Sequence, residues 1–112
     1  MRPRRASGLI VHRILVLLPE AVADVAHGYN CYEQQEPGLG EEFLCCLDET
    51  YALIAASPLR YPVRFDSFRR ILVRRFPYQV YFEHDEQAVY VYYVFHCSQD
   101  PEKVLHRLKR PG

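Results

Sequence analysis

The chain has 112 residues, of which 49% are hydrophobic and 25% charged, and its formal net charge is zero. This length fits one domain, and the apolar content is too high for a disordered chain. No apolar run is long enough to cross a membrane, and the basic first residues are not followed by the apolar region of a signal peptide. We therefore expect one cytoplasmic domain over residues 11–110, preceded by a disordered basic tail over residues 1–10.

Charge is segregated along the chain even though it sums to zero. Residues 19–49 carry acids but no lysine or arginine: Glu20, Asp24, Glu33, Glu36, Glu41, Glu42, Asp48 and Glu49. Between residues 60 and 75 the only acid is Asp66, against the arginines Arg60, Arg64, Arg69, Arg70, Arg74 and Arg75. Segregation of this kind favours docking on a charged partner, although two solvated faces of opposite sign remain the simpler interpretation.

The four cysteines do not indicate a metal site. None of them forms a CxxC pair, and the adjacent Cys45 and Cys46 would point to different sides of a helix. We expect reduced thiols, as is usual in the cytoplasm, with no metal and no cofactor.

The first predicted elements are a strand and a helix. The apolar run over residues 14–18 is typical of a buried strand. Pro19 then suits the first turn of a helix, where its missing N–H has no cost. A stripe at helical spacing predicts the core face of this helix: Val22, Val25, Tyr29 and Tyr32. The segment 36–40, which reads EPGLG, ends it.

A second helix is predicted over residues 41–56 and ends before Ser57-Pro58. Its apolar face consists of Phe43, Leu47, Tyr51 and Ile54. Because the loop between the two helices is short, they should form an antiparallel hairpin. The hairpin cannot bury its apolar stripe alone, so it should lie on one face of a sheet.

Residues 59–68 are predicted to be a loop, followed by three strands over residues 69–76, 78–83 and 88–96. Alternation places Tyr78, Val80 and Phe82 on one face of the second of these strands. In the last strand it places Val89, Val91, Tyr93 and Phe95 on one face, and Tyr90, Tyr92, Val94 and His96 on the other. Asp100 and Pro101 then start a short helix that ends near Lys109.

Together these elements predict an α+β domain in two layers. It has an N-terminal strand, an antiparallel helical hairpin on a mostly antiparallel sheet, a three-stranded C-terminal meander and a short C-terminal helix. The sequence contains no internal repeat and no linker.

Several segments, in this order, resemble the RelE/ParE superfamily of type II toxin–antitoxin toxins. They are Pro19-Glu20-Ala21, the segment 32–44 (YEQQEPGLGEEFL), the link from Ser57-Pro58 to Tyr61-Pro62, the segment 69–82 (RRILVRRFPYQVYF) and the segment 96–105 (HCSQDPEKVL). The resemblance implies a RelE/ParE-like fold, no cofactor and a cognate antitoxin that forms a hetero-oligomer with the toxin. It also implies a role in plasmid stabilisation or stress response.

Two mechanisms are associated with this resemblance. ParE-like members inhibit DNA gyrase by protein–protein contact and are not enzymes, whereas RelE-like members cleave mRNA on the ribosome. The motif around Pro77-Tyr78 has the aromatic form of ParE-like chains and lacks the arginine usual in RelE-like nucleases, so we favour ParE. If the chain is a nuclease, the resemblance implies His96, Arg74 and Arg75 as catalytic residues. Relatives often carry arginines where this chain has Cys97-Ser98-Gln99, which leaves open a degenerate toxin that only binds antitoxin.

Partner contacts are expected from the arginine-rich segment and from tyrosines of the last strand, with no membrane partner. Strand alternation would place Arg69 and Arg70 on opposite faces, and likewise Arg74 and Arg75, so that one of each pair faces solvent or a partner. The predicted partner-binding residues are Arg69, Arg70, Arg74, Arg75, Tyr90 and Tyr92.

Overall fold

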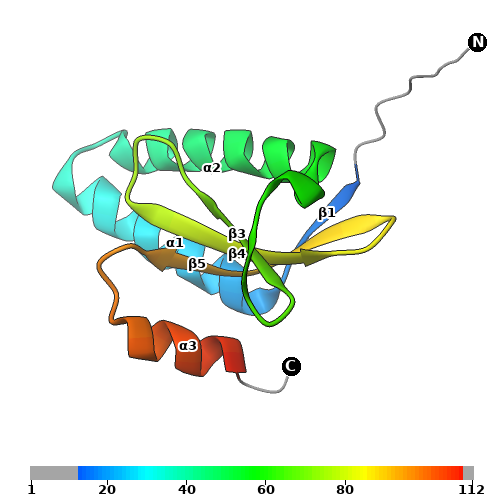
Figure 1. The fold of residues 1–112 in the computed structure, drawn as a ribbon. Coiled ribbons are helices and arrows are strands. Elements are labelled where there is room, and N and C mark those ends of the chain that lie inside the picture. Colours follow the sequence, from blue (N-terminus) through cyan, green and yellow to red (C-terminus); the bar gives the residue numbers. More distant parts are fainter. Residues whose placement is uncertain (1–12, 110–112) are drawn as a thin grey trace, which may run out of the picture.

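The computed structural model describes residues 13–109 (Figure 1). In chain order, the elements are β1 (Ile14–Leu17), α1 (Pro19–Gln35), α2 (Leu39–Ala56), the 3-10 turn η1 (Pro58–Arg60), β2 (Val63–Phe65), β3 (Phe68–Leu72), β4 (Tyr78–His84), β5 (Ala88–His96) and α3 (Pro101–Lys109). The predicted tail over residues 1–10 lies outside the described residues.

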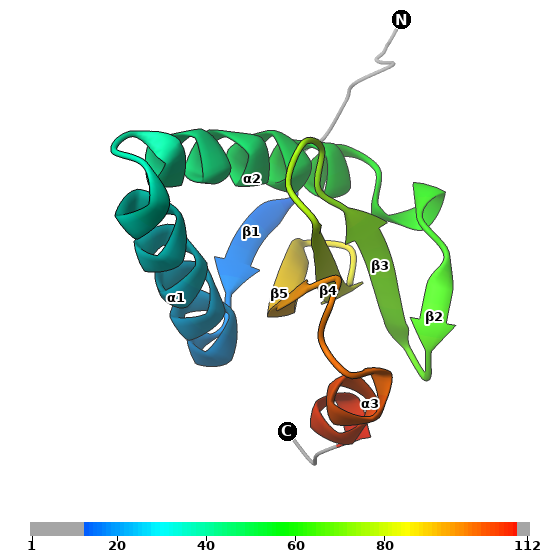
Figure 2. The same cartoon turned by 90° about the vertical axis from the view of Figure 1, so that its left-hand side faces the viewer.

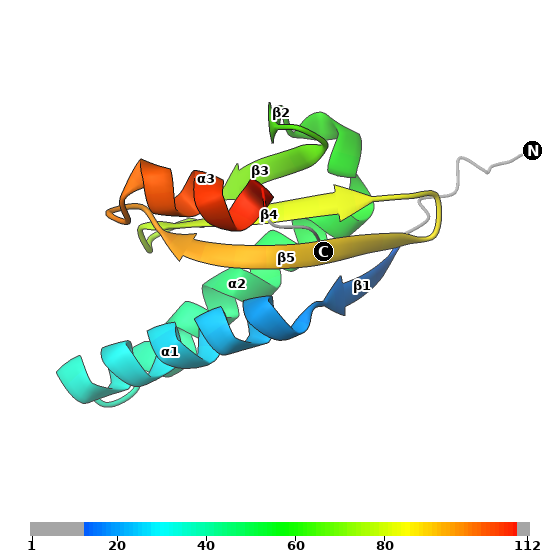
Figure 3. The same ribbon diagram turned by 90° about the horizontal axis from the view of Figure 1, so that it is seen from below.

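The strands form one sheet in the order β1-β5-β4-β3-β2, in which β1 is parallel to β5 and all other pairs are antiparallel. The hairpin of α1 and α2 covers one face of this sheet, which confirms the predicted α+β fold (Figures 1 and 2). The terminal helix α3 lies on the opposite face and adds a partial layer there (Figure 3). Within residues 13–109, no helix is long and apolar enough to cross a membrane.

On the hairpin side of the sheet, α2 contributes more buried residues to the core than α1 does. All four residues predicted for its apolar face are buried, namely Phe43, Leu47, Tyr51 and Ile54. The rings of Tyr32, Phe76 and Tyr78 surround the ring of Phe43, with centroids between 4.8 and 5.4 Å away. Aromatic packing of this kind, in tilted and edge-to-face geometries, joins α1, α2 and the sheet.

The predicted core face of α1 is partly wrong. The side chain of Val22 is 52% exposed, whereas Ala21 and Gly28 are buried. Small residues face the core here because α1 approaches α2 and the sheet closely. A Cβ atom at Gly28 would lie 2.9 Å from a ring carbon of Phe43 and 3.0 Å from the Tyr78 hydroxyl. A pattern of large apolar residues therefore could not identify this contact face.

Two boundaries on the C-terminal side also differ from the prediction. The predicted loop over residues 59–68 contains η1 and the short strand β2. The strand predicted over residues 69–76 ends at Leu72, because the chain then turns and Arg75 adopts a φ of 75°. Asp66 has a φ of 51° in the turn that separates β2 from β3, a conformation that aspartate tolerates better than most residues.

A β-bulge in β5 overturns the predicted alternation of that strand. Tyr81 pairs with Tyr93, but the next residue, Phe82, pairs with Val91, so Tyr92 is the extra residue. Val91 and Val94 consequently lie in the hairpin-side core. The aromatic residues Tyr93 and Phe95 lie in the cluster on the α3 side. The side chains assigned to one face by simple alternation are thus divided between both faces.

The cluster on the α3 side combines aromatic rings of the sheet with Val104 and Leu108 of α3. The helix begins as predicted, because the Asp100 carboxylate accepts a hydrogen bond from the Glu102 N–H at 2.9 Å. The Arg107 guanidinium lies 4.5 Å from the centroid of the Tyr93 ring and 4.9 Å from that of Phe95. This aromatic face of the sheet thus accommodates a cation.

Candidate functional site

Two of the predicted site arginines, Arg74 and Arg75, lie in the turn between β3 and β4. The Arg74 guanidinium pairs with Glu49 at 2.7 Å and that of Arg75 pairs with Glu42 at 2.8 Å. Hydrogen bonds to these carboxylates raise the pKa of both arginines. The prediction that strand alternation places these two arginines on opposite faces is wrong, since both pair with acids of α2 from a turn where alternation does not apply.

The other two arginines lie on opposite faces of β3, as predicted. Arg69 donates a hydrogen bond to the Tyr61 carbonyl at 2.6 Å, on the hairpin side where its strand partner is Phe82. Arg70 donates to the Gln79 side chain at 3.3 Å. Both residues are half-buried, and their hydrogen bonds tie β3 to the segment before β2 and to β4.

The two predicted partner-binding tyrosines have separate surroundings. Tyr90 donates a hydrogen bond to Asp85 at 3.0 Å, and this bond raises the pKa of Tyr90. Tyr92 packs edge-to-face on Phe68 with a centroid distance of 5.0 Å. Burial, together with a hydrogen bond to Glu83, raises the pKa of Tyr92. The two tyrosines therefore have different partners, Asp85 for Tyr90 and Phe68 with Glu83 for Tyr92.

Asp85 organises the turn between β4 and β5 and gives it a testable dependence on pH. Its carboxylate accepts hydrogen bonds from the N–H groups of Gln87 and Ala88, both at 2.8 Å, and from Tyr90. These bonds, first that from Gln87, lower the pKa of Asp85. The stabilisation is therefore complete above the pKa of an unfolded aspartate, about 3.9, and is lost as the pH falls through the lower folded value.

We expect Asp85→Asn to make stability less dependent on pH below about pH 4, because the amide cannot titrate there. The measurement is urea unfolding, followed by circular dichroism, at pH values from about 2.5 to 6. Asp48→Asn, an exposed change on α2, serves as the control. Equal slopes of stability against pH for Asp85→Asn and the parent chain would contradict the role given to this carboxylate.

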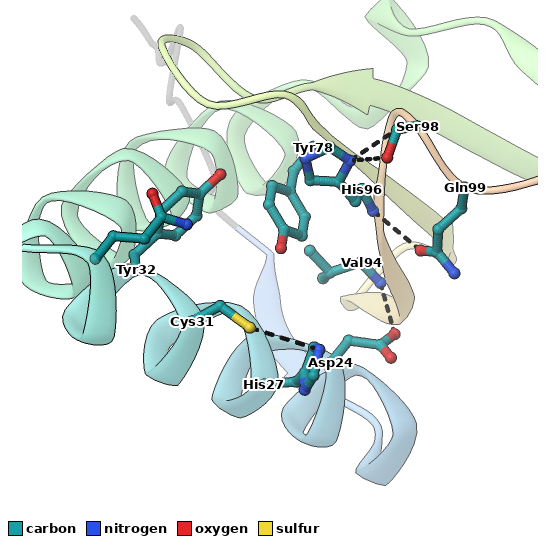
Figure 4. A pocket seen from close by; sticks show the side chains of 10 residues that line it. Asp24, His27, Cys31, Tyr32, Tyr78, Val94, His96, Ser98 and Gln99 are labelled. Carbon is teal, nitrogen blue, oxygen red and sulfur yellow. Dashed lines mark hydrogen bonds between the residues drawn. The ribbon is translucent and has the colours of Figure 1, made fainter.

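His96 lies at the end of β5 in a cleft of about 460 Å³ between that strand and α1 (Figure 4). The wall on the side of α1 consists of Asp24, His27, Cys31, Tyr32 and Gln35. The other wall consists of Tyr78, Val94, His96, Ser98 and Gln99. The rings of Tyr78 and His96 meet edge-to-face with centroids 5.1 Å apart.

The polar groups of this cleft are largely occupied by one another. The His96 Nδ1 atom accepts a hydrogen bond from the Ser98 backbone N–H at 3.0 Å. The backbone N–H of His96 donates a hydrogen bond to the Gln99 side chain at 3.1 Å. On the facing helix, Asp24 accepts from the Val94 N–H at 3.0 Å and pairs with Arg107 at 3.2 Å. Asp24 thereby closes the edge of β5 at the point where β1 no longer covers it.

These contacts limit the chemistry available to His96. The Ser98 N–H donates to Nδ1 of His96, so this ring nitrogen is already occupied as an acceptor. Burial raises the pKa of Tyr78 to about 12, which keeps its phenol protonated near neutral pH. None of the described residues lining the cleft is a lysine or an arginine. The cleft is thus poorly suited to binding phosphate.

The structure does not assemble the predicted catalytic set around His96. Its contacts are with Tyr78, Ser98 and Gln99, whereas Arg74 and Arg75 turn toward α2.

Sequence reasoning missed the ion pair of Asp24 and Arg107. The two residues are 83 positions apart, and nothing in the sequence around either one indicates that they meet. It also missed His27 and Cys31, whose side chains are 3.7 Å apart, although their i, i+4 spacing was visible. Among the described residues, no group of histidine, cysteine and acidic side chains could hold a metal ion.

Comparison with known proteins identifies the family of the chain. The family described as "ParE toxin of type II toxin-antitoxin system, parDE" matches residues 15–101. The chromosomal ParDE toxin–antitoxin system from P. aeruginosa has a similar structure, with a TM-score of 0.67 and 15% identity over 76% of this chain and 96% of that chain. The RelBE2 toxin–antitoxin complex from Mycobacterium tuberculosis gives a TM-score of 0.55 and 18% identity over 81% of this chain and 98% of that chain.

No curated protein matches the sequence. At 15% and 18% identity, the two solved structures show a shared fold and no more. The family match is more informative, because it extends from β1 to the start of α3. The chain therefore belongs to the ParE family of toxins of type II toxin–antitoxin systems.

Proposed function

We propose that this toxin arrests growth by inhibiting DNA gyrase through protein–protein contact and that a cognate antitoxin neutralises it. The observation that carries the proposal is the environment of His96. This histidine accepts a hydrogen bond from the Ser98 N–H, and no lysine or arginine lines its cleft among the described residues. Such a cleft lacks the cation that would stabilise the charge developing during RNA cleavage. Inhibition by contact requires no such group.

The arginines of the β3–β4 turn support the antitoxin part of the proposal. Arg74 and Arg75 already pair with carboxylates, those of Glu49 and Glu42 on α2. Their side chains are 68% and 53% exposed, so a partner protein can reach them and exchange one carboxylate for another. We propose that acidic residues of the antitoxin bind these arginines, together with Arg69 and Arg70, and that Tyr90 and Tyr92 contribute contact area to partner binding.

A second candidate is a degenerate toxin that binds antitoxin without acting on a target. It is favoured by the segment Cys97-Ser98-Gln99, where the resemblance to the family implies arginines and where Ser98 and Gln99 instead bind His96. The two candidates differ in whether the chain alone stops growth.

Induced expression in a bacterial host that lacks the antitoxin separates these functions. Growth, DNA synthesis and protein synthesis are followed after induction. We expect growth arrest with early loss of DNA synthesis and an SOS response, which would place the toxin in the cytoplasm with gyrase. Early loss of translation would instead support the mRNA nuclease, and no arrest from folded protein would support the degenerate toxin.

The variant His96→Ala is expected to keep its toxicity, because the proposed mechanism transfers no proton. If His96 were a general acid or base, the same change would lower activity by a factor of about 10² to 10⁴. The measurement is the amount of inducer needed for growth arrest, with protein levels compared by immunoblot. Ser98→Ala, which removes a hydroxyl beside Nδ1 of His96, controls for disturbance of the turn. Loss of toxicity in folded His96→Ala would contradict the proposal.

A further inference from the structure

A second cavity, of about 610 Å³, lies on the α3 side of the sheet, away from His96. It opens between the start of α1, the β2–β3 turn and the C-terminal end of α3. Its apolar lining includes Phe65, Phe68, Tyr92 and Leu108. The rings of Phe68 and Tyr92 stand at 83° to one another, so the cavity offers aromatic surface in more than one orientation.

Carboxylates predominate among the charged groups around this aromatic lining. Among the described residues that line the cavity, Glu20, Asp66 and Glu83 are acidic and Lys109 alone is basic. Glu83 accepts a hydrogen bond from the Ser67 hydroxyl and one from Tyr92. A carboxylate has about four acceptor sites, so Glu83 retains capacity for a ligand.

Aromatic faces beside carboxylates are the chemistry that recognises a guanidinium group, which stacks on rings and donates paired hydrogen bonds to carboxylates. The protein already binds a guanidinium group of its own on the neighbouring part of the sheet's α3 side. Its own Arg107 lies over the rings of Tyr93 and Phe95 and pairs with Asp24. The cavity repeats the combination of rings and carboxylates beside Phe68 and Tyr92. Its net negative charge would at the same time repel nucleic acid.

We propose that this cavity receives an arginine side chain presented by the toxin's protein target. The assignment rests on the proposed function, because an enzyme that handles DNA carries cationic surfaces for the phosphate backbone. Charge complementarity favours the target over the antitoxin as the occupant, since the antitoxin is expected to offer acids to the arginines on and after β3. The arginine would stack on Tyr92 and donate hydrogen bonds to Glu83 and Asp66.

The test is a titration of the ¹⁵N-labelled full chain, followed by NMR, with N-acetyl-arginine methylamide. The matched probe is N-acetyl-citrulline methylamide, which has nearly the same shape without the charge. We expect saturable shifts around Phe68 and Tyr92, with the arginine probe binding about fivefold or more tightly than the citrulline probe. Equal affinities for the two probes, or shifts elsewhere on the protein, would overturn the proposal.

Variants connect this binding to the carboxylates. Asp66→Asn keeps a residue that tolerates positive φ, and both it and Glu83→Gln are expected to weaken the arginine probe by about threefold or more. Glu102→Gln, on exposed α3 surface, should bind the probe like the parent chain. Full affinity of folded Asp66→Asn and Glu83→Gln for the arginine probe would show that these carboxylates do not recognise its charge.

Two further comparisons identify the occupant. The sequence continues beyond Lys109 with Arg110, and tighter binding of the probe by a chain ending at Lys109 would assign the cavity to the protein's own arginine and overturn the proposal.

Inhibition of purified gyrase by Asp66→Asn and Glu83→Gln is measured in parallel, and we expect weaker inhibition than by the parent chain. If both variants inhibit gyrase as strongly as the parent chain, the cavity does not bind the target, and the proposed function stands. If the parent chain binds the arginine probe but does not inhibit gyrase, the proposed function fails, and with it the assignment of the occupant to gyrase.

Discussion

Replacing Phe43 with alanine is expected to destabilise the protein by about 3–5 kcal/mol. Its side chain is fully buried and packs against the rings of Tyr32, Phe76 and Tyr78. The substitution removes contacts that join both hairpin helices to the sheet, and the surrounding aromatic rings cannot collapse into the space. Because domains of this size are stable by about 5–15 kcal/mol, a large part of the stability would be lost.

Urea unfolding measures this effect, and Leu53→Ala provides the matched control on the same helix. The Leu53 side chain is 50% exposed, so its truncation should change stability by about 0.5 kcal/mol or less. Similar losses for the two variants would mean that Phe43 does not occupy the centre of the core.

Replacing Asp24 with alanine is expected to cost about 2–4 kcal/mol. The change leaves the Val94 N–H at the edge of β5 without its acceptor and Arg107 without its carboxylate. The side chains of Asp24 and Arg107 are only 17% and 26% exposed, so water compensates for the loss incompletely. One carboxylate thus connects α1, the sheet edge and α3.

The variant Asp24→Asn separates the two contributions. Its amide oxygen still accepts a hydrogen bond from the Val94 N–H, whereas the charge facing Arg107 is lost, so its stability should lie between those of Asp24→Ala and the parent chain. Urea unfolding of the three proteins at neutral pH gives the comparison. A change below about 0.5 kcal/mol for Asp24→Ala would contradict its connecting role.

Elements with strong local signals could be predicted from the sequence. The apolar face of α2, the start of α1 at Pro19 and the cap of α3 at Asp100 each depend on residues close together in the chain. The bulge at Tyr92 could not be predicted, because it depends on how β4 and β5 align and not on the composition of β5. The close approach of α1 also escaped prediction, since it depends on the small residues Ala21 and Gly28.

The candidate site was less predictable than the fold. His96 and the four arginines were identified by residue type, but their roles depend on partners distant in the sequence. Arg75 pairs with Glu42, 33 residues away, and Arg107 reaches Asp24 from the other face of the sheet. Strand alternation failed for Arg74 and Arg75 because both lie in a turn, where it no longer determines direction.

The supercoiling of relaxed plasmid by purified gyrase, in the presence of increasing amounts of this protein, tests the central claim most directly. The gyrase should come from the organism that carries this chain. We predict that supercoiling is inhibited, that His96→Ala inhibits equally well, and that the cognate antitoxin restores activity. Full gyrase activity at a large excess of folded protein, together with cleavage of mRNA on ribosomes, would contradict the account.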